Sequence, residues 1–284
     1  MRLGAYIGEF HSPEEWAHIH LQHGYGAVYW PFDTVPYTSD SETIQGYVDS
    51  AARHGLVIAE VGAWCNMLDP KPSVRDANLN YIIGQLRLAD QVGARCCVNI
   101  AGSLNPALWD GPHPDNLTEA TFGLTVELIQ QIIDSAKPRN TFYTIEQMPW
   151  LFPYDIPSTH RLLKAVNRSA LAVHVDMCNM INAPDKVYRT GELTREFFSE
   201  FGPLIRSVHV KDLTITDELT VCIREVIPGQ GVFDLETLLN ECAKLDSDLP
   251  VMAEHLETQA QYLQSTGFLK KKAAEMGLGF VTGH

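Results

Sequence analysis

No uninterrupted apolar run in the sequence approaches the ~18 residues that a membrane-spanning helix needs. The first residues, MRLGAYIGEF, also lack the apolar segment and small-residue cleavage site of a secretory signal peptide. The six cysteines are scattered without a C-x-x-C pair, which is typical of reduced thiols and not of a disulfide framework or a zinc ribbon. We therefore expect a cytoplasmic protein without a membrane partner.

Positive charge is scarce. The chain has 21 Lys and Arg against 35 Asp and Glu, a net charge of −14 at pH 7 with neutral His. A surface of this sign repels phosphate backbones and so argues against long-range attraction to DNA or RNA, although a local basic groove is compatible with it. We expect no nucleic-acid partner.

What the sequence does contain is an alternation of short β-branched or aromatic runs with longer amphipathic ones, which is typical of repeated βα units around a parallel sheet. Eight candidate strands begin near Arg2, Ala27, Leu56, Ala94, Thr141, Leu171, Ile205 and Pro250. Their average spacing, (250 − 2)/7 or about 35 residues, fits the length of a βαβ crossover. With 45% hydrophobic residues, 284 residues are enough for a full core.

The segments between the strands have helical signatures. These begin near Ser12, Ser41, Asp76, Thr118, Pro157, Thr194, Asp234 and Thr258. Eight βα units predict a single (β/α)₈ TIM-barrel domain over residues 1–284. The longest irregular stretches are predicted at 101–116, 179–191 and 213–232, after the fourth, sixth and seventh strands, on the face where barrel active sites form.

Four consecutive candidate strands carry a potential metal ligand near their C-terminal ends: Glu146, Asp176, His209 and Glu254. Each acid alone could be an ordinary polar residue, but in a closed barrel these strand ends converge at one mouth. Three carboxylates with one imidazole suit Mn²⁺ best, with Mg²⁺ or Co²⁺ as alternatives. The sequence therefore predicts a divalent metal site.

Residues two apart on a strand face the same side, so Lys211 shares a side with His209 and His174 with Asp176. Lys211 can polarise a substrate oxygen or transfer a proton, or it can simply pair with a site carboxylate. His174 lies deeper in its strand, where a hydrogen bond to a ligand is the expected role.

Several of these residues lie in segments that resemble those of a known protein family. The chain resembles the xylose-isomerase-like TIM-barrel superfamily, the sugar phosphate isomerase/epimerase group that also includes ketose 3-epimerases, keto-inositol dehydratases and apurinic-site endonucleases. The matching segments are E-x-M-P-W at 146–150, H-V-D at 174–176, H-V-K-D at 209–212, P-G-x-G at 228–231 and E-H-L at 254–256.

The resemblance implies that Glu146, Asp176, His209 and Glu254 hold the metal and that Glu146 and Glu254 form the proton-transfer pair of an epimerase. A divalent ion can neutralise a developing enediolate, while two carboxylates deprotonate one face of a carbon and reprotonate the other. We expect a metal-dependent sugar isomerase or epimerase that binds a small carbohydrate.

One departure concerns Asn179, at a position where epimerase-type members and the endonucleases often carry His. Asn can hydrogen-bond a substrate hydroxyl but is a poor ligand for a second metal. The endonucleases also have D-x-H after the seventh strand, and residues 220–226 contain none. Both features argue against the nuclease activity.

Further substrate contacts are expected near the mouth. Trp30, Trp64 and Trp150 follow the second, third and fifth strands, where an indole can stack on a sugar face or pack against a loop. His11, after the first strand, is a candidate for a substrate hydroxyl. Gly229 and Gly231 are explained by turn formation without a phosphate site.

Two other functions stay open. A lyase would share the first proton abstraction and then lose a β-substituent, as in a keto-inositol dehydratase or in β-elimination from a 3-keto-glycoside or C-glycoside. A non-catalytic sugar- or partner-binding barrel would keep the architecture without the chemistry. The sequence leaves open the phosphorylation state of the substrate and whether a homo-oligomer or a partner subunit forms.

Overall fold

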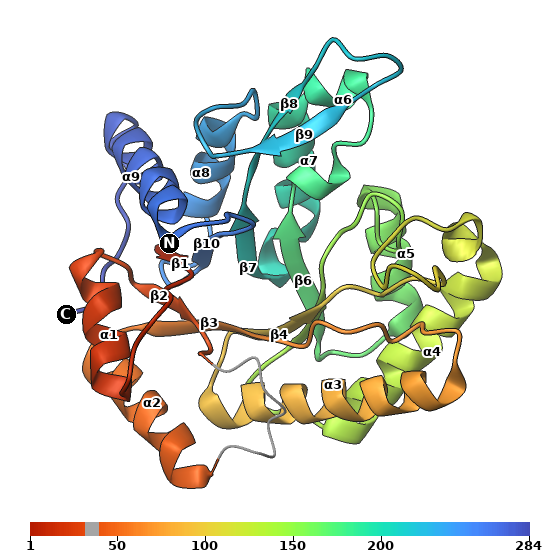
Figure 1. Cartoon of the computed structure of the whole chain (residues 1–284), viewed down its shortest axis with the longest axis horizontal. Helices are drawn as coiled ribbons and strands as arrows, with labels where there is room; N and C mark the ends of the chain where they lie inside the picture. Colours follow the sequence, from red (N-terminus) through yellow and green to blue (C-terminus); the bar gives the residue numbers. More distant parts are fainter. Residues whose placement is uncertain (32–39) are drawn as a thin grey trace. The chain divides into compact units, whose positions relative to one another are not determined.

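A computed structural model describes residues 1–31 and 40–284 of the chain (Figure 1). Eight strands form one sheet in the order β1-β10-β7-β6-β5-β4-β3-β2, and the strands alternate with helices along the chain. The strands are β1 (Arg2–Ala5), β2 (Ala27–Tyr29), β3 (Val57–Gly62), β4 (Cys96–Asn99), β5 (Tyr143–Ile145), β6 (Leu171–Asp176), β7 (Ile205–Val210) and β10 (Pro250–Ala253). All eight begin within two residues of the expected positions, and the predicted TIM-barrel fold is confirmed.

The main helices are α1 (Pro13–Gln22), α2 (Ser41–Arg53), α3 (Pro72–Val92), α4 (Glu119–Ala136), α5 (Ile156–Val166), α7 (Thr190–Phe201), α8 (Leu235–Ala243) and α9 (Gln259–Glu275). Side-chain caps set several of these boundaries, because they satisfy backbone N–H groups that have no partner within the helix. Ser12 accepts from the N–H of Glu15, and Asp234 accepts from that of Thr237. The caps at Ser12, Thr118, Asp234 and Thr258 lie where the sequence indicates them.

Two helices begin earlier than expected. Helix α3 begins at Pro72 and not at Asp76, because proline at the first helical position needs no N–H partner. Helix α7 begins at Thr190 and not at Thr194, whose hydroxyl donates to the carbonyl oxygen of Thr190 at 2.8 Å inside the helix. A threonine can therefore be mistaken for a cap when it bonds back to the preceding turn.

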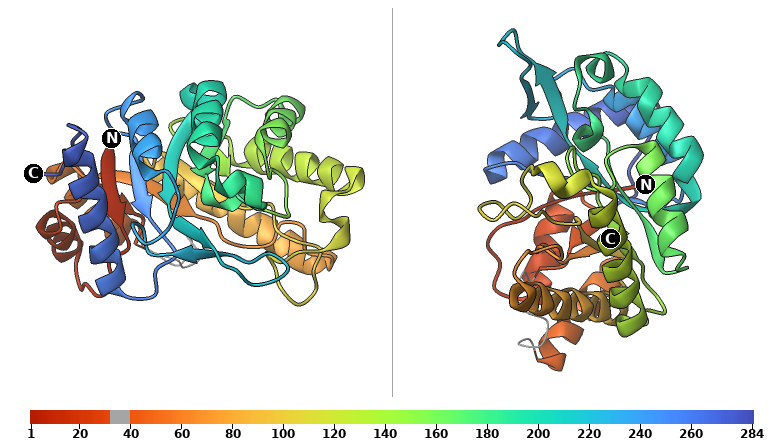
Figure 2. Two further views of the ribbon diagram at one scale, coloured as in Figure 1. Left: turned by 90° about the horizontal axis from the view of Figure 1, so that it is seen from above. Right: turned by 90° about the vertical axis from the view of Figure 1, so that its right-hand side faces the viewer.

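Two of the stretches expected to be irregular contain regular structure. Residues 213–232 include most of an antiparallel ribbon of β8 (Asp212–Ile215) and β9 (Ile223–Val226), paired from Asp212↔Val226 to Ile215↔Ile223. Residues 179–191 include the short helix α6 (Pro184–Val187). The ribbon extends outward from the elements around it (Figures 1 and 2). Its alternating pattern is short, so tertiary contacts decide its pairing.

The described residues divide into two compact units. Of the described residues, unit 1 comprises Met1–Tyr29, Glu42–Ala59 and Val175–His284, and unit 2 comprises 30–31, 40–41 and Glu60–His174. The expectation of one domain over the whole chain stays a prediction.

In unit 1, β10 pairs in parallel with β1 and with β7, so that Met252 lies opposite both Gly4 and His209. Helix α8 contacts α7 and α9, and α9 contacts β1 and β10. Only glycine fits at position 4, because a Cβ there would overlap the backbone oxygen of Ala27. The pairing of β10 with β7 brings the ends of these two strands together.

In unit 2, β3, β4, β5 and β6 pair in parallel, and α4 contacts both α3 and α5. Many core-facing positions of these helices are apolar, including Leu86 of α3 and Ile129 of α4, whereas Gln85 and Thr125 are buried polar residues. Burying such stripes against the sheet is the main stabilisation of the unit.

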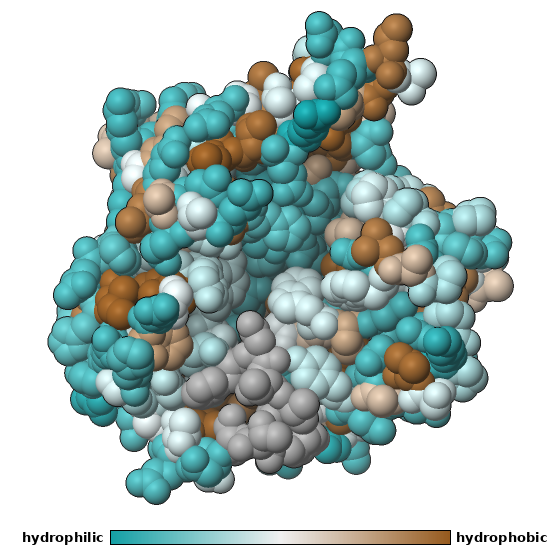
Figure 3. Space-filling view, viewed as in Figure 1, coloured by the Kyte–Doolittle hydropathy of each residue, from teal (hydrophilic) through white to brown (hydrophobic). Residues whose placement is uncertain are grey.

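Within the described residues, no helix is both long and apolar enough to cross a membrane. On the face drawn in Figure 3, hydrophobic residues form scattered patches among hydrophilic ones. Scattered apolar residues of this kind are ordinary for a protein surface.

Candidate metal centre

Three potential ligands of unit 1 lie at the C-terminal ends of strands. Asp176 is the last residue of β6, His209 is the penultimate residue of β7, and Glu254 directly follows β10. Because Ala253 pairs with Val210, the register places Glu254 just beyond the end of β7. This is the end of the strands where TIM barrels build active sites.

The donor atoms of Asp176, His209 and Glu254 lie within 4.8 Å of one another. His209 Nδ1 is 2.8 Å from Glu254 Oε2. Asp176 and His209 are buried, at 0% and 2% exposure. Two carboxylates and an imidazole at this separation fit a hard or borderline divalent cation, whose charge would offset the cost of burying the acids.

Lys211 lies among the same carboxylates and is itself buried. Its Nζ is 2.8 Å from Asp176 Oδ2, 3.1 Å from Glu254 Oε2 and 3.7 Å from Glu225 Oε1. A buried ammonium is stable only with such partners. The ammonium of Lys211 therefore lies within ion-pair distance of both Asp176 and Glu254.

Two residues of this cluster were not expected from the sequence, Glu225 of β9 and His255. His255 Nδ1 is 3.2 Å from Glu225 Oε2, and its Nε2 is 3.3 Å from Glu254 Oε1. The β8–β9 ribbon brings Glu225 to this position, so its role depends on a pairing that the sequence did not reveal. His255 directly follows a predicted ligand, and this adjacency was the available signal.

Charge interactions dominate the protonation of this cluster. Burial alone would raise the pKa of Glu254, but the neighbouring His209 and Lys211 lower it well below its ordinary value. Burial also favours a higher pKa for Glu225. The hydrogen bond with His255 and the charge of Lys211 nevertheless bring the pKa of Glu225 below its usual range. The hydrogen bond with Glu225 raises the pKa of His255. Glu254 is therefore ionised at neutral pH, as a metal ligand or proton acceptor must be.

In unit 2, a buried group of three residues contains the remaining predicted ligand, Glu146, which follows β5. His174 Nδ1 is 3.8 Å from Glu146 Oε2, and His174 Nε2 is 3.4 Å from Glu60 Oε2. All three residues are at most 3% exposed. His174 thus lies between two carboxylates, consistent with the expectation that it orients a ligand.

The predicted aromatic contacts of unit 2 differ in exposure. Trp64 and Trp150 are 40% and 38% exposed, whereas Trp30 is buried at 5%. Trp64 lies against Gly62, where no side chain would fit, and Trp150 Nε1 donates to the carbonyl oxygen of Asp110 at 2.6 Å. Only Trp64 and Trp150 present substantial exposed surface for stacking.

Asn179 and His11 belong to unit 1. The N–H of Asn179 donates to Asp176 Oδ1 at 3.1 Å, and its Oδ1 accepts from Lys211 Nζ at 3.5 Å. His11 is exposed ahead of α1, and its N–H donates to Glu15 Oε2 at 2.7 Å. Asn179 therefore joins the cluster around Asp176, and His11 shows no contact with it.

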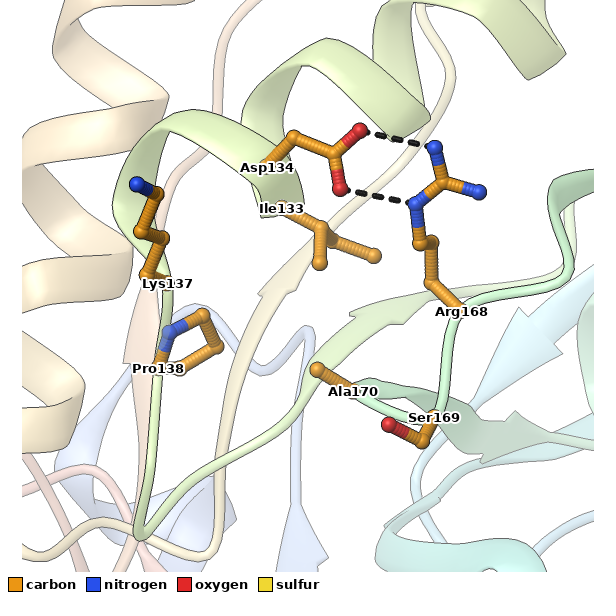
Figure 4. Close-up of a pocket in the computed structure, with 7 residues that line it drawn as sticks. All are labelled: Ile133, Asp134, Lys137, Pro138, Arg168, Ser169 and Ala170. Carbon is orange, nitrogen blue, oxygen red and sulfur yellow. Dashed lines mark hydrogen bonds and ion pairs between the residues drawn. The ribbon is translucent and has the colours of Figure 1, made fainter.

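A cavity of about 150 Å³ adjoins the cluster and is lined by residues that include Lys211, Glu225, Glu254 and His255. A larger cavity of about 400 Å³ in unit 2 has a different character. There the guanidinium of Arg168 donates two hydrogen bonds of 2.7 Å to the carboxylate of Asp134 (Figure 4). Two other lining residues, Pro138 and Ala170, precede β5 and β6 in the chain. It lies at the N-terminal ends of its strands, where barrels do not carry their active sites.

Comparison with known proteins gives a family-level match. The model of the xylose isomerase-like TIM barrel family matches residues 19–272. No curated protein sequence matches the chain.

Many solved structures are similar in fold, among them the following three. The probable 3-DHS dehydratase AsbF of Bacillus anthracis has a TM-score of 0.71 at 15% identity, covering 94% of this chain and 97% of its own. The 3-keto-D-glucoside 4-epimerase YcjR of E. coli has a TM-score of 0.67 at 14% identity, and the match covers 95% of this chain and 99% of YcjR. A xylose isomerase-like TIM-barrel protein of Mycobacterium smegmatis, in complex with magnesium, has a TM-score of 0.67 at 14% identity. The match covers 93% of this chain and 90% of that protein.

Proposed function

Because the chain belongs to the xylose isomerase-like TIM barrel family, we propose that it is a divalent-metal-dependent isomerase or epimerase of a small carbohydrate. The observation that carries the proposal is the group of Asp176, His209 and Glu254 with Lys211 beside it. Such a costly set of buried charges is typical of a catalytic centre. Structural neighbours described as an epimerase and a dehydratase support the reaction class.

In this proposal Asp176, His209 and Glu254 hold the metal together with Glu146. Mn²⁺ is the proposed ion, with Mg²⁺ or Co²⁺ as alternatives, because the oxygen-rich donor set suits these ions. When bound, the ion would supply positive charge for a substrate oxygen that becomes negative as a proton leaves the neighbouring carbon.

The chain's own residues then move the protons. Glu254, whose pKa lies well below its ordinary value, is ionised and accepts a proton from the carbon beside a carbonyl. Glu146 returns a proton to the opposite face. Lys211 donates a hydrogen bond to a substrate oxygen, and Asn179 binds a hydroxyl next to it. Trp64, Trp150, Trp30 and His11 are the remaining proposed substrate contacts.

Glu254→Gln tests the mechanism, because it keeps the size of the side chain and removes its basicity. We expect a folded protein that no longer exchanges the substrate proton. Glu127→Gln, at an exposed position on α4, is the matched control and should behave as the wild type. An active Glu254→Gln variant would exclude the two-carboxylate mechanism.

The assay is NMR in D₂O with Mn²⁺ and a panel of ketoses, keto-inositols and 3-keto-glycosides. Deuterium at a carbon beside the carbonyl demonstrates proton abstraction, and chelation should abolish it. A mixture of stereoisomers then identifies an isomerase or epimerase, whereas an enone or a released aglycone identifies a lyase. A chain that binds neither Mn²⁺ nor any substrate of the panel would favour a non-catalytic barrel.

A further inference from the structure

A second group of potential ligands lies on the outside of unit 1. Glu14 and His18 occupy successive turns of α1, and His54 directly follows α2. One ligand atom from each of the three lies within 4.8 Å of the other two. None of these residues belongs to the strand-end cluster, so their arrangement needs a separate explanation.

The ring of His54 has an oxygen close to each nitrogen. Its Nδ1 is 3.3 Å from the backbone oxygen of His284, and its Nε2 is 2.7 Å from Glu14 Oε1. A neutral imidazole carries only one proton. With that proton on Nε2, the ring donates directly to Glu14 Oε1. With the proton on Nδ1, the lone pair of Nε2 faces the carboxylate, and a cation held by both atoms satisfies this arrangement.

The ring of His18 is held in a similar way. Its Nδ1 is 2.8 Å from the backbone oxygen of Glu14, and its ring centroid is 5.0 Å from that of His54. The same Nδ1 is 3.7 Å from Glu14 Oε1, so the ring lies beside the carboxylate. When Nδ1 donates to the carbonyl, Nε2 keeps the lone pair. Metal-binding histidines are commonly oriented by such a bond from the other nitrogen.

The carboxylate of Glu14 is also oriented from outside the group. Its Oε2 accepts from Arg53 Nη2 at 2.7 Å and from Ser50 Oγ at 3.3 Å, which leaves Oε1 directed at the histidines. The hydrogen bonds from His54 and Arg53 lower the pKa of Glu14 to about 2. The carboxylate is therefore ionised throughout the neutral range.

We propose that Glu14, His18 and His54 bind a Zn²⁺ ion. Two imidazoles and one carboxylate form a ligand set that zinc uses in proteins, with water in the fourth position. Each ligand is held by a second hydrogen bond, which limits the ordering that binding requires. Glu14 Oε1 and His54 Nε2 are 2.7 Å apart and must separate slightly to take the ion between them. The ion would join α1 to the residue after α2 and so brace this side of unit 1.

The competing explanation is an ion-pair network in which a protonated His54 and Arg53 neutralise Glu14 without any metal. The two explanations differ in stoichiometry. A zinc site adds one Zn²⁺ per chain that depends on His18, whereas an ion-pair network adds none.

The test is a Zn²⁺ titration of the full chain, stripped of metal, against a chromogenic chelator. We expect wild type to bind one more equivalent than His18→Ala or His54→Gln. His160→Ala, an exposed histidine on α5, is the control and should match wild type. The side chain of His18 is 56% exposed, so His18→Ala should fold normally, which circular dichroism verifies.

Two further variants sharpen the test. Arg53→Met removes a residue that orients Glu14 and should weaken this zinc site about 10- to 100-fold. Asp176→Asn should remove a different equivalent, so failure of the strand-end centre and failure of this site give distinct results. Equal zinc stoichiometry in wild type, His18→Ala and His54→Gln, or an equal loss in His160→Ala, would overturn the proposal.

Discussion

Replacement of Asp212 should loosen the segment that follows the β8–β9 ribbon. The buried carboxylate accepts four backbone N–H groups: Oδ1 from Leu213 at 2.8 Å and Phe233 at 3.1 Å, and Oδ2 from Gly229 and Gly231, both at 2.9 Å. One side chain thus organises the P-G-x-G turn, directly beside Lys211. The sequence pattern explains this turn by its glycines alone.

The magnitude follows from these bonds. A hydrogen bond to a charged group contributes about 1.5–3 kcal/mol, but four bonds that share one carboxylate are not additive. We expect Asp212→Ala to lower the free energy of unfolding by about 4 kcal/mol. Asp212→Asn keeps one acceptor oxygen for two of the four N–H groups but turns its NH2 donors toward the other two, so a loss similar to that of Asp212→Ala is expected.

Urea unfolding followed by circular dichroism measures the loss, and hydrogen exchange locates it. Exchange should accelerate at the N–H groups of Gly229, Gly231 and Phe233. Asp185→Ala, at an exposed position in α6, is the control and should change stability by no more than about 0.5 kcal/mol. If Asp212→Ala kept wild-type stability and the two glycine N–H groups stayed protected, the assignment of this carboxylate as the organising group would be refuted.

Three other predictions concern unit 1. Burial lowers the pKa of His20 to about 4. Because the unfolded chain then binds this proton more readily, the free energy of unfolding should fall by about 3 kcal/mol as pH falls from ~6.5 toward 4; an NMR titration midpoint of His20 near 6.5 would contradict this. Glu14, with its pKa lowered to about 2, stabilises above pH ~4.5 and loses this effect as pH falls toward 2, so Glu14→Gln should flatten the acid side of a urea-midpoint profile. Gly231→Ala should cost about 2 kcal/mol in urea unfolding, because a Cβ would overlap Asp212 and Leu213; a neutral effect would show that the turn can shift.

Much of the fold follows from local patterns. The starts of all eight barrel strands and the caps of α1, α4, α8 and α9 were predictable, because hydrophobic periodicity and capping depend on neighbouring residues. The β8–β9 ribbon was not predictable, because a two-stranded ribbon depends on contacts with residues distant in the chain. The early starts of α3 and α7 show how a proline or a back-bonded threonine can override an expected cap.

The sequence by itself determined the repeating βα pattern and the positions of acids, His209 and Lys211 at the strand ends, because strand periodicity and order are properties of the chain. Only the tertiary structure decided that Lys211 lies between Asp176 and Glu254, that Glu225 and His255 join them, and that Asp212 holds the turn at Gly229 and Gly231. It also decided the meeting of Glu14 and His18 with His54. Residues far apart in sequence come into contact only through packing and strand register, and a local sequence pattern does not determine which of them meet.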